Sequence, residues 1–166
     1  MNKPWIAVSA AVLLASPGAY ASGIGEGDFE AGLSLTLTST SIEIDGVEQP
    51  DSDSGQIEVS GGMFFTDQLE AKVALSASVS SAYTAGTLKP GVDYFFTTGG
   101  DVVPFAGGAY ALGMFDTETD YIDAHGGVKY FFRERTSVEA RLSYQMATDS
   151  LYDDVVDLFV GLNVYF

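Results

Sequence analysis

The sequence predicts an all-β protein: an eight-stranded, antiparallel, up-and-down transmembrane β-barrel preceded by a cleaved signal peptide. Three observations predict this class. Apolar and polar residues alternate with a period of two along most of the chain, as they do in strands with two different faces. Turn residues divide this pattern into eight segments. The connections alternate between short turns and mostly longer loops, which is typical of membrane barrels.

The start of the chain predicts a signal peptide over residues 1–21, so that one barrel domain occupies residues 22–166. Lys3 supplies a positive charge, and an apolar stretch of 11 residues follows from Trp5 to Ala15. Ala19-Tyr20-Ala21 then has the small-x-small form of a cleavage site. A transmembrane anchor needs about 18 or more apolar residues, and this stretch is shorter.

Composition argues against several function classes. After cleavage, 6 basic residues would face 23 acidic ones, a formal net charge of −17, and such a surface repels nucleic-acid phosphates. The chain has no cysteine, hence neither disulfides nor a thiolate metal site. The longest uncharged runs, 73–88 and 102–115, are interrupted by Ser and Thr or by Gly and Pro, so neither predicts a membrane-spanning helix. If the chain crosses a bilayer, it does so as a closed barrel.

The expected strands follow from this punctuation. They cover residues 30–44, 55–65, 69–83, 87–96, 102–115, 121–132, 136–145 and 155–166. The tight connections are 66–68, 97–101 and 133–135, and the longer acidic ones are 45–54, 116–120 and 146–154, with 84–86 as a short exception. This alternation predicts short turns on the periplasmic side and loops outside.

An aromatic repeat marks the ends of the even-numbered segments. Residues 91–96, 127–132 and 161–166 each begin with glycine and end in aromatic residues, and 60–65 is a looser copy. All four copies fall at the same end of the barrel, which predicts an aromatic girdle at one membrane interface. The alternative is a set of aromatic core corners in a soluble barrel.

The charged residues of the alternating segments indicate which face is enclosed. That polar face carries five acids and four bases, namely Glu58, Glu70, Lys72, Lys89, Asp93, Lys129, Glu139, Arg141 and Asp157. The longer loops, in contrast, contain acids and no Lys or Arg. Near balance is expected of a confined interior, where charges must be paired.

The register of one hairpin sharpens this expectation. A turn centred on Glu134 places Lys129 opposite Glu139, with Arg141 one inward position further along, and opposite charges across a strand pair stabilise it. We therefore predict an interior polar network of Lys129, Glu139 and Arg141, extended by Glu58 and Asp93. Eight strands enclose only enough room for side chains, so the interior should be plugged.

Together, these motifs give a resemblance to a known family. The signal peptide, the Gly-x-x-Tyr-Phe-Phe segment ends, Val103-Pro104-Phe105 and the terminal hexapeptide 161–166 resemble the small outer-membrane β-barrel domain family, which includes the OmpA membrane domain and OmpX. In that family a terminal aromatic residue, preceded by alternating apolar residues, is the signal read by the barrel-insertion machinery. The matching residues here are Phe166, Val164, Leu162, Val160 and Leu158. Unlike in OmpA, we expect no peptidoglycan-binding domain after Phe166.

Two constellations could carry chemistry. His125 is the single histidine, and lipid A deacylases among the eight-stranded barrels use a His-x-Ser pair with a distant Glu. Gly127 stands at the serine position, so an acid such as Glu139 and a base would lack a nucleophile. Acids at alternate positions in 51–53 and 116–120 suit calcium, but neither segment has the glycine and closing Glu of an EF-hand loop.

The expected function is therefore non-enzymatic. We expect a barrel in the outer membrane of a Gram-negative bacterium, with extracellular loops and periplasmic termini, that supports envelope integrity or presents surface loops. The alternatives are a lipid A-modifying enzyme, a narrow solute channel and a soluble periplasmic lipocalin-like binder. Expected partners are outer-membrane lipid and lipopolysaccharide, the barrel-assembly machinery, periplasmic chaperones, and divalent cations held weakly at the acidic loops. We expect a monomer without a cofactor or metal site.

Overall fold

The computed structural model describes residues 24–40, 43–44, 47–48, 52–79, 84–96, 100–115, 119–149 and 154–166. The expected signal peptide therefore lies outside the described residues. The strands are β1 (Phe29–Thr40), β2 (Glu43–Ile44), β3 (Val47–Glu48), β4 (Ser52–Thr66), β5 (Leu69–Val79), β6 (Thr84–Phe95), β7 (Val102–Phe115), β8 (Tyr121–Arg133), β9 (Thr136–Ala147) and β10 (Val155–Tyr165). No helix among these residues is long and apolar enough to cross a membrane.

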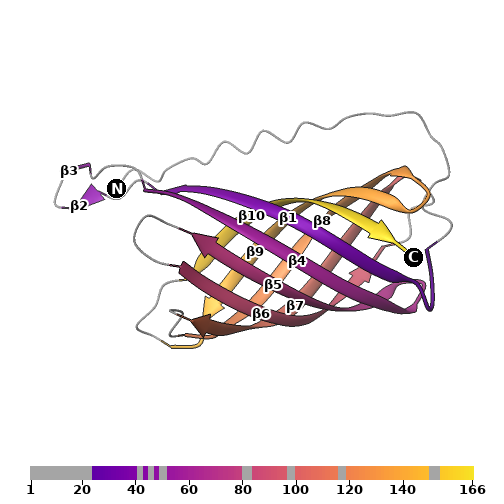
Figure 1. Cartoon of the computed structure of the whole chain (residues 1–166), viewed down its shortest axis with the longest axis horizontal. Helices are drawn as coiled ribbons and strands as arrows, with labels where there is room; N and C mark the ends of the chain where they lie inside the picture. Colours follow the sequence, from indigo (N-terminus) through magenta and orange to yellow (C-terminus); the bar gives the residue numbers. More distant parts are fainter. Residues whose placement is uncertain are drawn as a thin grey trace.

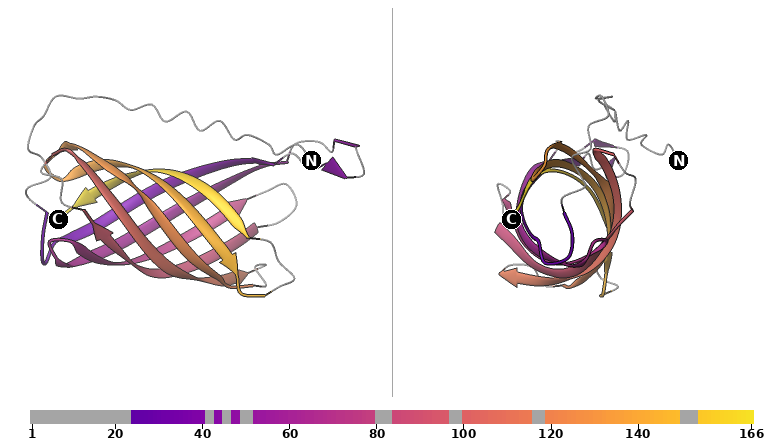
Figure 2. Two further views of the ribbon diagram at one scale, coloured as in Figure 1. Left: turned by 180° about the vertical axis from the view of Figure 1, so that it is seen from behind. Right: turned by 90° about the vertical axis from the view of Figure 1, so that its right-hand side faces the viewer.

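Eight of the strands close into one antiparallel barrel. Its order is β1-β10-β9-β8-β7-β6-β5-β4, and β4 pairs back onto β1 (Figures 1 and 2). The short strands β2 and β3 form a separate hairpin in the β1–β4 connection. Each barrel strand therefore pairs with the barrel strands before and after it in sequence, and the last pairs with the first. The predicted eight-stranded up-and-down barrel is confirmed.

Two predicted connections differ from the structure. The first strand and connection were expected at 30–44 and 45–54, but β1 ends at Thr40, β2 and β3 form their own hairpin, and β4 begins at Ser52. The connection expected at 84–86 was misplaced. Residues 84–86 belong to β6, where Gly86 pairs with Ala77 on one side and Met114 on the other. The sequence pattern suggested a turn because glycine usually punctuates strands. Here Gly86 lies within a ladder that is bonded on both sides, a place where glycine is tolerated although it adds no side-chain packing.

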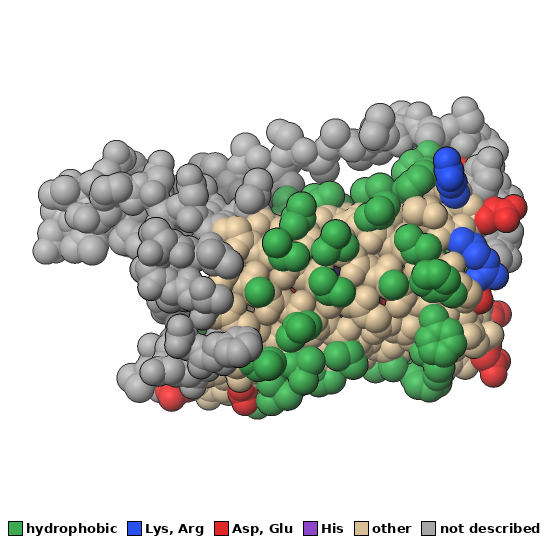
Figure 3. All heavy atoms as spheres, in the orientation of Figure 1, with side chains coloured by type: hydrophobic (Ala, Val, Ile, Leu, Met, Phe, Trp, Pro, Cys, Tyr) green, Lys and Arg blue, Asp and Glu red, His purple; other side chains and the backbone are tan. Residues whose placement is uncertain are grey.

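The alternation of residues sorts side chains between the inside and the outside of the barrel. In β9, Ser137, Glu139, Arg141, Ser143 and Gln145 are buried, while the intervening residues are exposed. The exposed set is apolar: Leu142 is 53 % exposed, and Val160 in β10 is 54 % exposed. Figure 3 shows these apolar side chains spread over the barrel wall, with charged side chains gathered at its ends.

This distribution is the reverse of a soluble barrel. A lipocalin-like protein buries its apolar face and exposes its charged face to water, whereas this barrel exposes a belt of large apolar side chains from all eight of its strands and encloses the charged ones. Large exposed apolar surfaces mark contact with a membrane or a partner. An apolar outer band around a polar interior is the arrangement of transmembrane barrels.

The C-terminus and the short turns share one end of the barrel (Figure 1). The backbone N–H of Tyr165 donates to the carbonyl of Arg135 (3.0 Å), and Phe95 donates to Gln68 (2.8 Å). Phe29 and Phe166 exchange backbone hydrogen bonds at the same end. We call this the turn end, and the opposite end the loop end.

Candidate functional site: the enclosed polar interior

The half of the interior nearer the turn end is organised around Lys129, which has no exposed surface. Its ammonium group is hydrogen-bonded to Glu30 of β1 and lies 3.6 Å from Glu139 of β9. Lys72 of β5 also contacts Glu30 (3.3 Å) and Glu139 (3.9 Å). The side-chain amide of Asn163 donates to Glu139 (3.1 Å). Two ammonium groups thus share two carboxylates contributed by different strands.

A second group of ions lies nearer the loop end. Arg141 donates to Glu58 of β4 at 2.5 Å, and Lys89 of β6 donates to the other oxygen of Glu58 at 3.4 Å. The Arg141 guanidinium lies 4.4 Å from the centre of the Phe159 ring, a cation–π distance. Arg141 also lies 3.7 Å from Glu139, so one residue joins the two groups.

His125 provides another link between strands. Its Nε2 lies 2.7 Å from Asp93 of β6 and its Nδ1 lies 2.7 Å from Asp123 of β8. Asp123 also accepts a hydrogen bond from Ser143 (2.7 Å). Gly107 makes this possible, because a Cβ there would lie 2.6 Å from the imidazole Nε2. With both ring nitrogens facing carboxylates, the His125 side chain links β8 to β6 across the inner face of the sheet.

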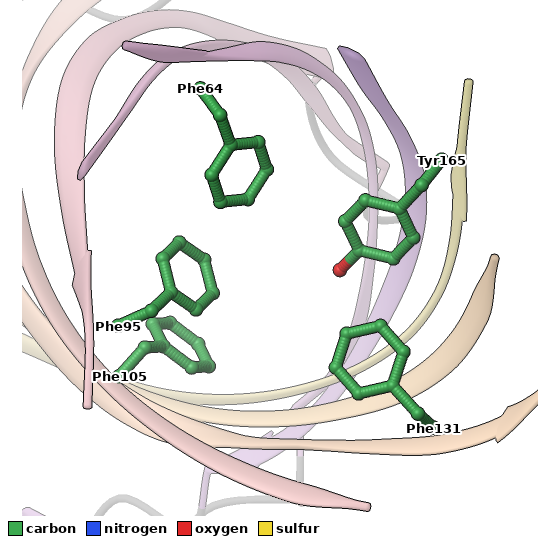
Figure 4. Packing of buried hydrophobic residues seen from close by; sticks show 5 residues of the cluster. All are labelled: Phe64, Phe95, Phe105, Phe131 and Tyr165. Carbon is green, nitrogen blue, oxygen red and sulfur yellow. The ribbon is translucent and has the colours of Figure 1, made fainter. Parts of the chain in front are cut away.

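Five aromatic side chains close the interior at the turn end (Figure 4). This aromatic plug consists of Phe64, Phe95, Phe105, Phe131 and Tyr165. Neighbouring rings are 5.2 to 6.3 Å apart between centroids. The Lys129 ammonium lies 4.8 Å from the centre of the Phe95 ring, so the ion network rests directly on the plug. Ile24, which precedes the first strand, packs against the plug from outside.

The aromatic repeat therefore has two roles, which corrects the prediction of a girdle alone. Within each copy, neighbouring aromatic residues point in opposite directions because strand side chains alternate. Phe95 and Phe131 are buried in the plug, while Phe96 and Phe132 are 47 % and 42 % exposed on the outer surface. One repeat thus supplies both an interior plug and an outer aromatic rim.

Two cavities of the described interior are small. One cavity, lined by Glu58, Lys89, Asp93, Asp123, His125 and Arg141 among others, has a volume of about 20 Å³. That is room for a single water molecule. A second cavity of about 50 Å³ lies beside the plug, between Ile24 and Tyr165. Neither is large enough to pass a solute.

The structure brings the predicted network residues together. Lys129 and Glu139 are directly paired in the β8–β9 ladder, and Arg141 joins them through Glu139. Glu58 lies against Arg141, and Asp93 reaches Lys72 at 3.8 Å. All nine charged residues assigned to the polar face are buried.

Sequence reasoning missed Glu30 and Asp123. Both are buried in the interior, which raises the buried acids of the barrel strands to seven against four buried Lys and Arg, so the interior is more acidic than expected. Glu30 stands at every second position with Gly32, Ser34 and Thr36, and this shared polar face was the signal that could have placed Glu30 inside.

The geometry offers no catalytic or metal constellation in the described residues. No group of three or more His, Cys, Asp or Glu residues there is arranged to hold a metal ion. Ser143 lies opposite His125 in the ladder, but its hydroxyl donates to Asp123. A serine nucleophile needs the hydroxyl against the base, and that contact is not made.

The acidic connections are only partly described. Residues 51 and 116–118 lie outside the described residues, as do the side chains of 52–54, so calcium binding there remains a prediction. Asp120 accepts hydrogen bonds from the Gly113 backbone (2.9 Å) and the Tyr110 hydroxyl (3.0 Å). That carboxylate therefore fastens the β7–β8 connection to the barrel.

At the turn end, Asp28 holds the segment before β1 through polar contacts. Its carboxylate accepts a hydrogen bond from the Gly25 backbone (2.9 Å) and contacts Arg135 (3.2 Å). The Gly25 hydrogen bond, helped by the Arg135 charge, lowers the pKa of Asp28 below its usual value. The turn end is thus held together by polar contacts outside the apolar belt.

The residues expected to form an assembly signal all lie in or just after β10. Leu158, Val160, Leu162 and Phe166 are 45 %, 54 %, 46 % and 67 % exposed, and Val164 is half-buried. They share the outer face of the strand that closes the barrel against β1.

Comparisons with known proteins show similarity at the level of structure. No family model matches the sequence, and no curated protein matches it. The N-terminal β-barrel domain of Pseudomonas aeruginosa OprF is similar with a TM-score of 0.61 and 17 % identity, over 86 % of this chain and 100 % of that one. Neisserial surface protein A gives 0.61 and 13 %, over 86 % and 99 %.

A third structure is Ail, the attachment invasion locus protein of Yersinia pestis, solved with the heparin analogue sucrose octasulfate. It gives a TM-score of 0.55 at 13 % identity, over 85 % of this chain and 99 % of Ail. At identities this low, the structural similarity shows the fold alone. The chain has the fold of the small eight-stranded outer-membrane β-barrels, with their transmembrane architecture.

Proposed function

We propose that this protein is a non-enzymatic outer-membrane barrel that supports envelope integrity or presents its loops at the cell surface. The observation that carries the proposal is the combination of an apolar outer belt with an interior filled by ion pairs and closed by the aromatic plug. Such a barrel is a closed membrane-inserted body whose longest connections, β1–β4 and β9–β10, lie at its loop end.

A solute channel is disfavoured by the same interior. The aromatic plug fills the turn end, and the Lys129 ammonium packs directly against it. The described cavities hold about one or a few water molecules. A lipid-modifying enzyme is disfavoured because His125 is held between Asp93 and Asp123 and lacks a hydroxyl nucleophile. A soluble binder is disfavoured by the exposed apolar belt.

The proposed orientation places the turn end in the periplasm and the loop end outside. Short turns on the periplasmic side are the rule for such barrels. The longer loops contain acids and no Lys or Arg, so they would repel a polyanion of the kind bound by Ail. We propose lipopolysaccharide and outer-membrane lipid as the surroundings, with divalent cations weakly screening the loops against them.

The expected route to the membrane involves periplasmic chaperones and the barrel-assembly machinery. The outward apolar residues of β10, ending in Phe166, supply a suitable signal for that machinery. Every described barrel strand is paired on both sides, so the sheet does not need a second copy to close it, and we propose a monomer.

Two measurements test the proposal. The protein should fractionate with detergent-extracted outer membrane and migrate faster on a gel unboiled than boiled. Purified barrel in planar lipid bilayers should show no steady ion conductance, whereas a variant with two plug rings removed, Phe95→Ala with Phe131→Ala, should conduct or flicker. Recovery as a soluble protein would refute the membrane assignment, and stable conductance steps by the unaltered barrel would refute the closed interior.

A further inference from the structure

Glu70 is the least satisfied charged group of the described interior. It has no exposed surface, and neither carboxylate oxygen has a hydrogen-bond partner among the described residues. Asp93 lies directly opposite in the β5–β6 ladder. One oxygen of Asp93, Oδ2, also lacks a hydrogen-bond partner there, while Oδ1 faces His125. The Lys72 ammonium lies 3.8 Å from Asp93 Oδ2, beyond hydrogen-bond distance. Two carboxyl groups with oxygens that lack hydrogen-bond donors thus face each other across one strand pair.

The cations around Glu70 are already engaged. Four charged groups act electrostatically on Glu70, namely Glu30 from β1, Lys72 on β5, Asp93 from β6 and Lys129 from β8. Both lysines make their closest contacts with Glu30, and each also faces Glu139.

The strand on the other side of Glu70, β4, contributes no charge. Gly62 and Phe64 are its inner-surface neighbours there. Gly62 makes room for the carboxylate, because a Cβ at that position would lie 2.6 Å from the Glu70 carboxyl carbon. Gly62 thus makes room for a buried acid at a place where β4 supplies no basic side chain.

An ionised Glu70 would be unfavourable in this position. Like charges directly opposite on a strand pair are destabilising, and a buried carboxylate without hydrogen bonds is costly unless it is paired or neutralised. Two carboxyl groups sharing one site resolve this by holding a single proton between them.

We propose that Glu70 and Asp93 form a proton-binding site in the barrel interior, with one proton held by the pair at neutral pH. The proton resides on Glu70, whose O–H donates to Oδ2 of Asp93. Asp93 remains a carboxylate and keeps its Oδ1 contact with His125. The pair then has a total charge of −1, and the proton converts two acceptors without donors into one hydrogen bond.

The site also reduces the acidic excess of the interior. Seven buried acids of the barrel strands face four buried Lys and Arg. A proton on Glu70 leaves six carboxylates, and the imidazole of His125 lies between two of them. A small metal cation is a poorer occupant than a proton, because the ammonium groups of Lys72 and Lys129 lie in the same part of the interior.

Infrared difference spectroscopy of the full folded barrel tests the proposal directly. The wild-type protein at neutral pH should show the C=O stretch of a buried carboxylic acid, and Glu70→Gln should lose it. The matched control is Glu139→Gln, which alters another buried acid and should keep the band. Absence of the band from folded wild-type protein, or its survival in Glu70→Gln, would overturn the proposal.

Stability provides a second, independent readout. The amide of Glu70→Gln can donate to Asp93 as the protonated acid does, so its urea midpoint should match that of the wild type. Glu139→Gln removes a charge facing Lys129 and Arg141 and should lower the midpoint. Equal losses in the two variants would overturn the proposal. If Glu70→Gln does not refold, Asp93→Asn serves instead, and an unchanged carboxylic-acid band in that variant would be the contrary result.

Discussion

Replacing Lys129 by Met tests whether the interior network is a dry structural element. The substitution keeps an apolar side chain of similar length against the plug and removes one positive charge. It deprives Glu30 of its closest cation and Glu139 of one of three. Leaving a buried charge without its partner typically costs about 3–5 kcal/mol.

The contacts left after the substitution narrow the expected loss of stability. Glu30 keeps Lys72 at 3.3 Å, and Glu139 keeps Arg141 at 3.7 Å and the amide of Asn163 at 3.1 Å. Neither carboxylate is left wholly without partners, which favours the lower end. Loss of the contact between the ammonium group and the Phe95 ring adds about 0.5–2 kcal/mol. We expect the free energy of unfolding to fall by about 3.5–5 kcal/mol.

Urea unfolding of refolded barrel in lipid or detergent measures this loss, with Glu134→Ala in an exposed turn as the control. A double-mutant cycle of Lys129→Met with Glu30→Gln should give a coupling of about 2–3 kcal/mol. Lys129→Met with Glu139→Gln should couple more weakly, because that pair is farther apart. A loss for Lys129→Met within about 0.5 kcal/mol, as for a surface substitution, would mean that the interior is solvated and the reasoning wrong.

Three further predictions follow from the outer face, the chain end and the close strand approach. Leu142→Arg should cost about 2–4 kcal/mol near the midplane in unfolding from lipid, with Leu142→Met nearly neutral; equal tolerance of both would argue against lipid at this face. Phe166→Ala should reduce the folded barrel recovered from outer membranes more than Phe132→Ala, an exposed aromatic at the same end, and equal yields would make the terminal position incidental. Gly107→Ala should lower the urea midpoint because its Cβ would approach the His125 imidazole, whereas Gly100→Ala, with open space around it, should not; matching midpoints would show that the imidazole yields freely.

Local patterns in the sequence determined the strands, their number and part of their register. The Lys129–Glu139 pairing followed from one tight turn, because the two residues lie close in sequence and the short connection at 133–135 leaves few alternatives. Alternation also assigned Leu142 and Arg141 to opposite faces, since strand geometry fixes that relation whatever the fold. Turn placement was less secure where a glycine such as Gly86 lies inside a strand.

Tertiary structure decided which groups meet across the barrel. Glu30 and Lys129 are separated by 99 positions, and only closure of β1 onto β10, with the tilt of the strands, brings them together. The same closure turned one aromatic of each repeat into the plug, and the β6–β7–β8 ladder placed His125 between two acids. A period of two tells which residues share a face, but the contacts inside depend on the relative shift of strands that are not neighbours in sequence, and no local pattern encodes that shift.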